Sequence, residues 1–286
     1  MKRIASLLMT GLRSVIFRQT IIALSITILI ASCTNINNQI SIEPVPERLG
    51  SMGYLPMDVI PNCLAILPPP PAEGSAAFAL DEEVSRNSLT LRNTPRWELA
   101  KKDDSTWFPA PANAFSCTLN VTISEQDTPH LYKLLQRTSD DVGFSDTSIK
   151  YEYKRPRPYL LNKEPVCSKV GIKELHSYPS GTAALGWAYA LILSEISPDQ
   201  TDALIIRGLV YGQSGVICNT NWQSAVNAGR TLAAAVVARL HAEPEFRDAI
   251  EAAKAELVDV RAKGLSLERD CEAEAAALSL SQASTP

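Results

Sequence analysis

Histidine is scarce in this sequence, and its cysteines are never closely spaced. The three histidines, His130, His176 and His241, lie far apart, and none of the six cysteines takes part in a CxxC pattern. Protein metal sites usually draw Cys and His ligands from short, regular spacings. The sequence therefore predicts no metal site, and nothing in it indicates a cofactor.

Alternation of apolar and polar residues, which marks a strand, is also missing over any useful length. Apolar residues recur instead at helical spacing, which predicts helices over 76–102 with a break at Thr94-Pro95, and over 126–143, 182–196, 201–211, 221–241 and 246–263. In the helix over 126–143 we expect Asp127 or Thr128 as the cap and Gly143 beyond the end. The expected fold class is all-α, a helical bundle.

An excess of positive charge is lacking as well. The formal net charge is −4, and residues 1–32 contain basic but no acidic residues, so the remainder of the chain is more acidic still. A protein that binds nucleic acid usually presents a basic surface. We therefore expect no nucleic-acid partner, and any bound anion must be held by a local cluster of cations.

The leader, residues 1–32, has the pattern of an export signal peptide. Its apolar run, Thr20 to Ala31, is shorter than the roughly 20 residues of a membrane-spanning helix. Ile30-Ala31-Ser32-Cys33 resembles the bacterial lipoprotein box, which implies cleavage before Cys33 and a membrane anchor through lipid on Cys33. Thr34, where an aspartate would retain the protein at the inner membrane, favours the outer membrane facing the periplasm. A plain signal peptide or an uncleaved anchor is the alternative.

Composition divides the rest of the chain. Residues 33–52 are polar and are expected to form a tether. Residues 53–264 are expected to form the helical domain, and residues 265–286 a frayed helix or disordered tail. Non-helical residues 51–75 should lie as a strap on the domain through their apolar side chains, Tyr54, Leu55, Ile60, Leu64 and Ile66.

Three short segments between Lys150 and Arg230 carry the candidate chemistry. The first places six residues between Lys150 and Arg157-Pro158, in a stretch rich in Lys and Arg. The second, Pro179-Ser180-Gly181, is typical of a helix start, where backbone N–H groups favour anions. The third, residues 214–227, is expected to be a polar loop that leads into a helix. Together they predict a site for an oxyanion.

The order and spacing of these segments resemble the bacterial class A non-specific acid phosphatases. That family belongs to the wider phosphatidic-acid-phosphatase type 2 (PAP2) and vanadium haloperoxidase superfamily. The likeness covers roughly residues 53–262 and includes residues 67–74 and 112–116. It implies the helical bundle of that superfamily. The family motif is Lys-x6-Arg-Pro, then Pro-Ser-Gly-His, then Ser-Arg-x5-His-x3-Asp.

The resemblance assigns phosphate binding to Lys150, Arg157, Ser180, Gly181 and Ser214. In the family, the last histidine of the motif attacks phosphorus and becomes a phosphohistidine. The aspartate one helical turn later orients that imidazole, and the histidine of Pro-Ser-Gly-His protonates the leaving oxygen.

The residues that would perform this chemistry are replaced here. Thr182 stands where the acid histidine is expected, Gly215 replaces the arginine, Asn221 the nucleophilic histidine and Ala225 the aspartate. An amide nitrogen is not a nucleophile, because its lone pair is delocalised into the carbonyl. Loss of a covalent nucleophile alone can lower turnover about 10⁶-fold. The sequence thus predicts a catalytically inactive protein that keeps part of a phosphate site.

Three alternatives stay open at the level of sequence. In the first, the motif spacing is fortuitous, and the basic side chains of residues 150–157 form a solvated surface rather than an anion site. An active acid phosphomonoesterase could use Ser180, Ser214 or His176 in place of the lost groups. A purely structural envelope protein is the third.

Export implies an oxidising compartment in which disulfides form. Beyond Cys33 the chain has five cysteines, so at least one of them stays free or pairs between molecules. Cys167 and Cys218 flank the motif segments, and we expect a disulfide between them.

Overall fold

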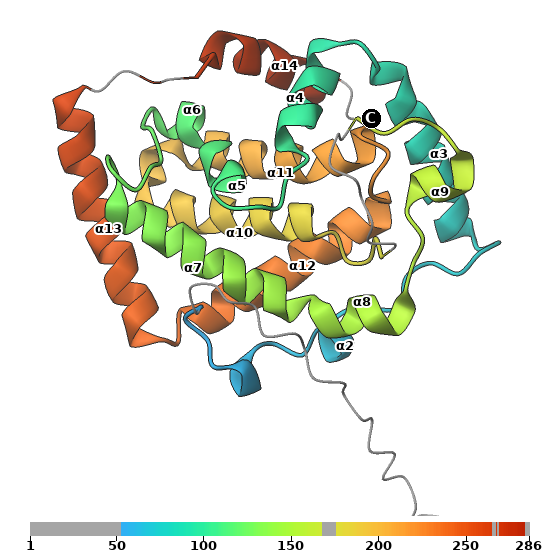
Figure 1. Ribbon diagram of the computed structural model, residues 1–286, viewed down its shortest axis with the longest axis horizontal. Coiled ribbons are helices and arrows are strands. Elements are labelled where there is room, and N and C mark those ends of the chain that lie inside the picture. The colour runs from blue at the N-terminus through green and yellow to red at the C-terminus, as the bar shows by residue number, and fades with distance from the viewer. Residues whose placement is uncertain (1–52, 168–175, 265–266, 268, 284–286) are drawn as a thin grey trace, which may run out of the picture. The chain divides into compact units, whose positions relative to one another are not determined.

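The computed structural model describes residues 53–167, 176–264, 267 and 269–283, and every regular element in these residues is a helix (Figure 1). The predicted all-α fold class is therefore confirmed. Within the described part of the chain, no helix is long and apolar enough to span a bilayer. The leader and the whole tether, residues 1–52 with Cys33, lie outside the described residues. The elements are η1 (Met57–Val59), α2 (Cys63–Ile66), α3 (Ala76–Ser88), η2 (Leu89–Leu91), α4 (Pro95–Asp103), α5 (Ala110–Asn113), α6 (Ser116–Leu119), α7 (Pro129–Ser145), α8 (Thr147–Tyr153), α9 (Pro158–Asn162), α10 (Gly181–Ile196), η3 (Pro198–Gln200), α11 (Thr201–Ile217), α12 (Gln223–Leu240), α13 (Pro244–Lys263) and α14 (Cys271–Ala283).

Helix α10 is the central element, and α7, α11 and α12 pack around it (Figure 1). Its sequence is Ala-rich and apolar on every side, as expected for a helix that is surrounded by others. Two glycines let α11 approach it closely. A Cβ on Gly186 would lie 2.5 Å from the Tyr211 ring, and a Cβ on Gly208 would lie 2.4 Å from the Ala190 Cβ. This close contact determines where the start of α10 and the end of α11 meet.

Helix α7 is capped from another helix rather than by its own flanking residues. Glu256 of α13 accepts hydrogen bonds from the backbone N–H groups of His130 (3.0 Å) and Leu131 (2.9 Å). A carboxylate at this end also offsets the positive end of the helix dipole. Thr128 occupies the cap position, but its side chain makes no capping bond to α7. The predicted end was wrong too: Gly143 lies inside the helix, which continues to Ser145.

Helix α11 is longer than the predicted 201–211 and ends at Ile217. The third candidate segment therefore begins in a helix, and only residues 218–222 form the loop before α12. The buried apolar face continues through Val216 and Ile217, which carries the helix past Gly212 and Gly215. Ser214 and Gly215 consequently have positions set by the packing of α11.

Residues 271–283 form α14, so the disordered alternative for the tail is wrong for these residues, and the predicted helix is packed on the domain rather than frayed. A disulfide joins Cys117 to Cys271, and the buried Glu274 lies 3.0 Å from Arg207 of α11. Ala277 is buried against Leu99 of α4. These contacts come from distant parts of the chain, and most of the stability of a short helix comes from such packing.

The predicted disulfide between Cys167 and Cys218 is confirmed, and Cys63 is free and buried. The strap prediction holds for Tyr54 and Leu55, which are buried. It was wrong for Leu64 and Ile66, which are exposed. Because residues 63–66 form one helical turn, Cys63 is the residue of that turn that faces the core.

Candidate functional site

The three candidate segments converge where the ends of four helices meet. Lys150 lies in the last turn of α8, Arg157 immediately before α9, and Ser180 and Gly181 at the start of α10. The end of α11 and the loop that follows supply Gly215 and Asn221. The contacts described below bring residues of the three segments next to one another, and their phosphate-binding roles stay predictions.

Lys150 reaches the start of α10 together with an aspartate. Its Nζ lies 2.6 Å from Asp146 Oδ2. A Cβ on Gly181 would lie 3.2 Å from that oxygen and 3.5 Å from Lys150 Nζ. A side chain at position 181 would therefore crowd this pair. Asp146 was not singled out from the sequence. Its spacing of four residues before Lys150 is nevertheless a recognisable signal, because residues four apart on a helix can form an ion pair.

Ser180 is the N-cap of α10. Its Oγ accepts a hydrogen bond from the Ala183 backbone N–H (3.2 Å), and its own N–H donates to the Ala225 carbonyl of α12 (2.9 Å). A Cβ on Gly229 would lie 2.4 Å from the Ser180 carbonyl oxygen, so glycine is needed for α12 to approach. These bonds place the first N–H groups of α10 beside the start of α12.

Arg157 bonds to the loop that carries Asn221. Its Nη1 donates to the Thr220 carbonyl at 2.8 Å. The Asn221 Nδ2 donates to Thr220 Oγ1 at 3.3 Å, and Asn221 is buried. A Cβ on Gly215 would lie only 2.6 Å from Asn221 Nδ2. The amide of Asn221 thus occupies the space that a side chain at position 215 would need.

Ser214 belongs to a buried network rather than to the loop. Its Oγ donates to Asp103 Oδ2 (2.8 Å) and accepts from Arg96 Nη2 (3.0 Å). The Asp103 carboxylate also accepts hydrogen bonds from both terminal nitrogens of Arg207, which is fully buried. Burial lowers the pKa of Arg207, but Asp103 and Glu274 outweigh this and raise it above its usual value. In this arrangement the Ser214 hydroxyl faces α4, and its predicted role in phosphate binding stays a prediction.

The basic run of residues 150–157 is not a solvated face. Arg155 is buried: its Nη2 donates to Asp81 Oδ2, its Nη1 donates to Ser224 Oγ, both at 2.7 Å, and it lies over the Trp222 ring. Burial lowers the pKa of Arg155, and the ion pair with Asp81 opposes that shift. Lys154 is the exposed member of the run. Arg155 therefore fastens α3 to the start of α12, so its role in the fold is structural.

The two remaining motif positions, Thr182 and Ala225, and the candidate acid His176 offer few polar groups. Thr182 is buried in the first turn of α10, and Ala225 is fully buried in the first turn of α12. His176 precedes the cis Tyr178-Pro179 bond, and its ring centroid lies 6.2 Å from that of Tyr151. Its Nδ1 is buried and has no hydrogen-bond partner among the described residues. Those residues contain no cluster of His, Cys, Asp and Glu suited to a metal ion.

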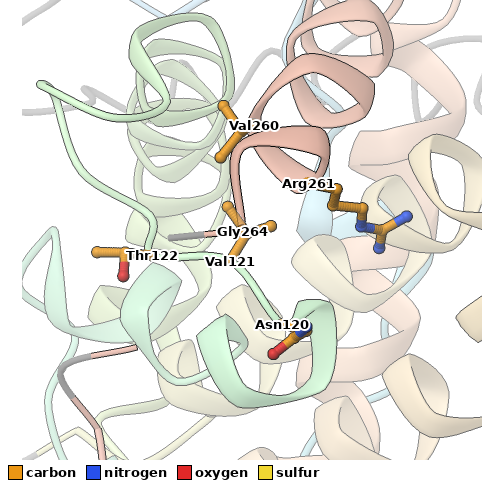
Figure 2. Close-up of a pocket in the computed structure, with 6 residues that line it drawn as sticks. All are labelled: Asn120, Val121, Thr122, Val260, Arg261 and Gly264. Carbon is orange, nitrogen blue, oxygen red and sulfur yellow. The ribbon is translucent and has the colours of Figure 1, made fainter. Parts of the chain in front are cut away.

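A small hollow lies away from the site, between residues 120–122 and the end of α13 (Figure 2). Figure 2 shows the Arg261 guanidinium extending away from Thr122 and Val260. Arg261 Nη2 donates to the Leu119 carbonyl and to Ser197 Oγ, so the cation supports the fold. The residues that line this hollow include none of the motif positions.

Comparison with known proteins agrees with this architecture. Residues 142–247, which contain all of the candidate segments, match the family model described as the PAP2 superfamily. A protein named non-specific acid phosphatase from Providencia stuartii is 41% identical over 212 residues, which cover 73% of this chain and 86% of that protein. One of the same name from Salmonella typhimurium is 35% identical over 202 residues, or 69% of this chain and 81% of the relative. An acid phosphatase from Zymomonas mobilis is 32% identical over 205 residues, or 69% and 76%. The chain belongs to the non-specific acid phosphatase family of the PAP2 superfamily.

Proposed function

We propose that this protein is an exported, lipid-anchored family member that keeps part of an oxyanion site but has lost the phosphohistidine mechanism. The observation that carries the proposal is the side chain at position 221. Asn221 replaces the attacking imidazole, and its amide lies against Gly215 and Thr220. An amide can donate or accept a hydrogen bond there, but it cannot form a phosphoenzyme.

The neighbouring replacements support the same conclusion. Ala225 supplies no carboxylate to orient an imidazole, and Thr182 supplies no acid for the leaving oxygen. Two of the three histidines lie elsewhere: His130 is in the first turn of α7, and His241, after the end of α12, lies 3.3 Å from Glu195. The Ser180 and Ser214 hydroxyls are already engaged, in the α10 cap and in the Asp103 network respectively. A substitute nucleophile is therefore not evident among these groups.

Hydrolysis of a chromogenic phosphomonoester from acid to neutral pH tests the loss of activity. We expect turnover several orders of magnitude below that of an active relative, since a lost nucleophile alone can lower it by ~10⁶. A rate within about tenfold of an active relative, measured side by side, would refute the proposal. If slow hydrolysis remains and His176→Gln abolishes it, the histidine with the unpartnered Nδ1 is the acid.

Retention of the oxyanion site is tested by calorimetry with inorganic phosphate. Lys150 and Arg157 supply the cations, and the start of α10 supplies N–H groups. We expect Arg157→Ala to weaken phosphate binding at least tenfold, because hydrogen bonds from a guanidinium to an oxyanion are strong. Lys154→Ala removes the same charge from an exposed position and is the matched control. Equal effects of the two substitutions would contradict a specific site.

The lipid anchor rests on the leader and on Cys33. Two disulfides, Cys117–Cys271 and Cys167–Cys218, support residence in an oxidising compartment. We expect the protein to partition into the detergent phase of a Triton X-114 extract and to sediment with outer membranes. Cys33→Ser should move it to the aqueous phase. Aqueous partitioning of the unaltered protein would exclude the anchor and leave the rest of the proposal standing.

A further inference from the structure

The side chain of Asp146 does not cap the helix that follows it. It is the N-cap residue of α8, a position at which an aspartate usually accepts hydrogen bonds from the first N–H groups of its own helix. Its side chain makes no such bond to α8. The carboxylate instead lies 2.6 Å from Lys150 Nζ, and only 7% of the aspartate side chain is exposed.

The same carboxylate lies at the start of a second helix. Asp146 Oδ2 would be 3.2 Å from a Cβ on Gly181, the first residue of α10. The N-terminus of a helix carries partial positive charge and favours anions. Asp146 Oδ2 thus has a cation on one side and the positive end of α10 on the other. These are the surroundings that the resemblance assigns to an oxygen of phosphate.

Ordinary helical ion pairs in this chain look different. Lys101 with Glu98, and Lys254 with Glu251, both have an acid side chain that is more than half exposed. Such pairs contribute little, because water screens them. A carboxylate that is almost fully buried has lost most of its hydration, so it must be compensated by the groups that it contacts. Lys150, whose Nζ lies 2.6 Å away, is one of the groups that compensate the buried carboxylate of Asp146.

We infer that Asp146 is an internal competitor for the oxyanion site, whose carboxylate takes the place of a ligand oxygen at Lys150 and Gly181. The inference rests on the proposed function, because it assumes that the site still accepts phosphate. A phosphate dianion that approaches Lys150 meets a cation already neutralised and a carboxylate of like charge. The site accordingly binds phosphate weakly for as long as Asp146 is charged and in place.

The test measures binding of inorganic phosphate to the folded protein by calorimetry. Asp146→Asn keeps the shape of the side chain and removes its charge. We expect it to bind phosphate about 10- to 100-fold more tightly than the unaltered protein, since a like charge a few ångströms away is removed from a partly buried site. Glu152→Gln is the matched control: it makes the same change in net charge at an exposed residue of α8. That control should change affinity by less than about twofold.

Asp146→Ser is a second variant in case the amide disturbs the fold, and circular dichroism checks both. Tighter binding by the Asp146 variants, lost again when Lys150→Ala is added, supports the inference. If the Asp146 variants bind no more tightly than the unaltered protein while Arg157→Ala still weakens binding, the inference fails and the proposed site stands. If no variant binds phosphate at all, the proposed oxyanion site fails, and the inference falls with it.

Discussion

Gly215 and Asn221 should behave as one unit in a double-mutant cycle. Gly215 lies inside α11, where replacing glycine by alanine ordinarily stabilises a helix by ~1 kcal/mol. Here the new Cβ would lie 2.6 Å from Asn221 Nδ2 and 3.3 Å from both Asn221 Cγ and Asn221 Cβ. Overpacking of this kind typically costs about 1–3 kcal/mol. We therefore expect Gly215→Ala to destabilise the protein by about 1–2 kcal/mol in the presence of Asn221.

In an Asn221→Ala background the closest obstacle, Nδ2, is absent together with Cγ, and only Cβ remains, at 3.3 Å. Gly215→Ala should then be neutral or stabilise by up to about 1 kcal/mol. The coupling between the two positions is the difference, about 1–3 kcal/mol, which is typical of residues in contact. Urea unfolding of the four proteins of the cycle, followed by circular dichroism, measures it.

Gly186→Ala is the control for this cycle. It is the same substitution in a buried helix, and its Cβ would lie 2.5 Å from the ring of Tyr211. It should destabilise equally in both backgrounds, because Asn221→Ala does not move that ring. Additive effects at positions 215 and 221, within about 0.5 kcal/mol, would mean that the Asn221 amide does not fill this space. The practical consequence is that arginine at position 215 and histidine at position 221 should be restored together.

Two further predictions concern buried carboxylates. Asp103→Asn should lower the free energy of unfolding by about 3–5 kcal/mol, because the buried Arg207 loses part of its charge compensation. The control Glu98→Gln, on the same helix, should lower it by under about 1 kcal/mol. Equal losses for the two variants in urea unfolding would contradict the role of the buried network around Asp103. Burial raises the pKa of Asp141 from 3.8 to about 6, although the N–H groups of Tyr54 and Leu55 bond to it and oppose the shift. The folded state therefore binds this proton more readily than the unfolded state, so the stability contributed by Asp141 falls as pH rises through that interval. Urea unfolding at several pH values should show that Asp141→Asn removes this fall, and an identical pH dependence in the variant would refute the assignment.

Sequence patterns located most of the helices but misplaced several boundaries. Apolar spacing along a helix is local, so the segments at 182–196 and 246–263 were found nearly to the residue. Boundaries failed where distant residues decide them. Glu256 caps α7 from α13, and α14 is held by Cys117 and by Arg207. No spacing within residues 126–143 or 265–286 contains that information.

The candidate site divides in the same way. The motif spacings singled out three segments that the structure brings into contact, through Lys150 and Gly181 and through Arg157 and Thr220. The spacings did not distinguish basic side chains that face the candidate site from basic side chains that are buried in structural ion pairs. Arg155 is adjacent in sequence to the candidate residues, but it is buried against Asp81, which lies on α3 far away in the chain. Which way a side chain points depends on the element packed against it.

The sequence alone determined what chemistry is available to this protein. Asparagine and alanine at positions 221 and 225 supply neither an imidazole nor a carboxylate, and no arrangement of the backbone changes the functional groups of a residue. Tertiary structure alone decided how the remaining groups are used. Asp146 and Lys150 are local neighbours in sequence, but their pairing acquires meaning only because the start of α10 lies beside them. That position follows from the close packing of α10 with α11 and α12, which brings groups from distant segments within a few ångströms of one another.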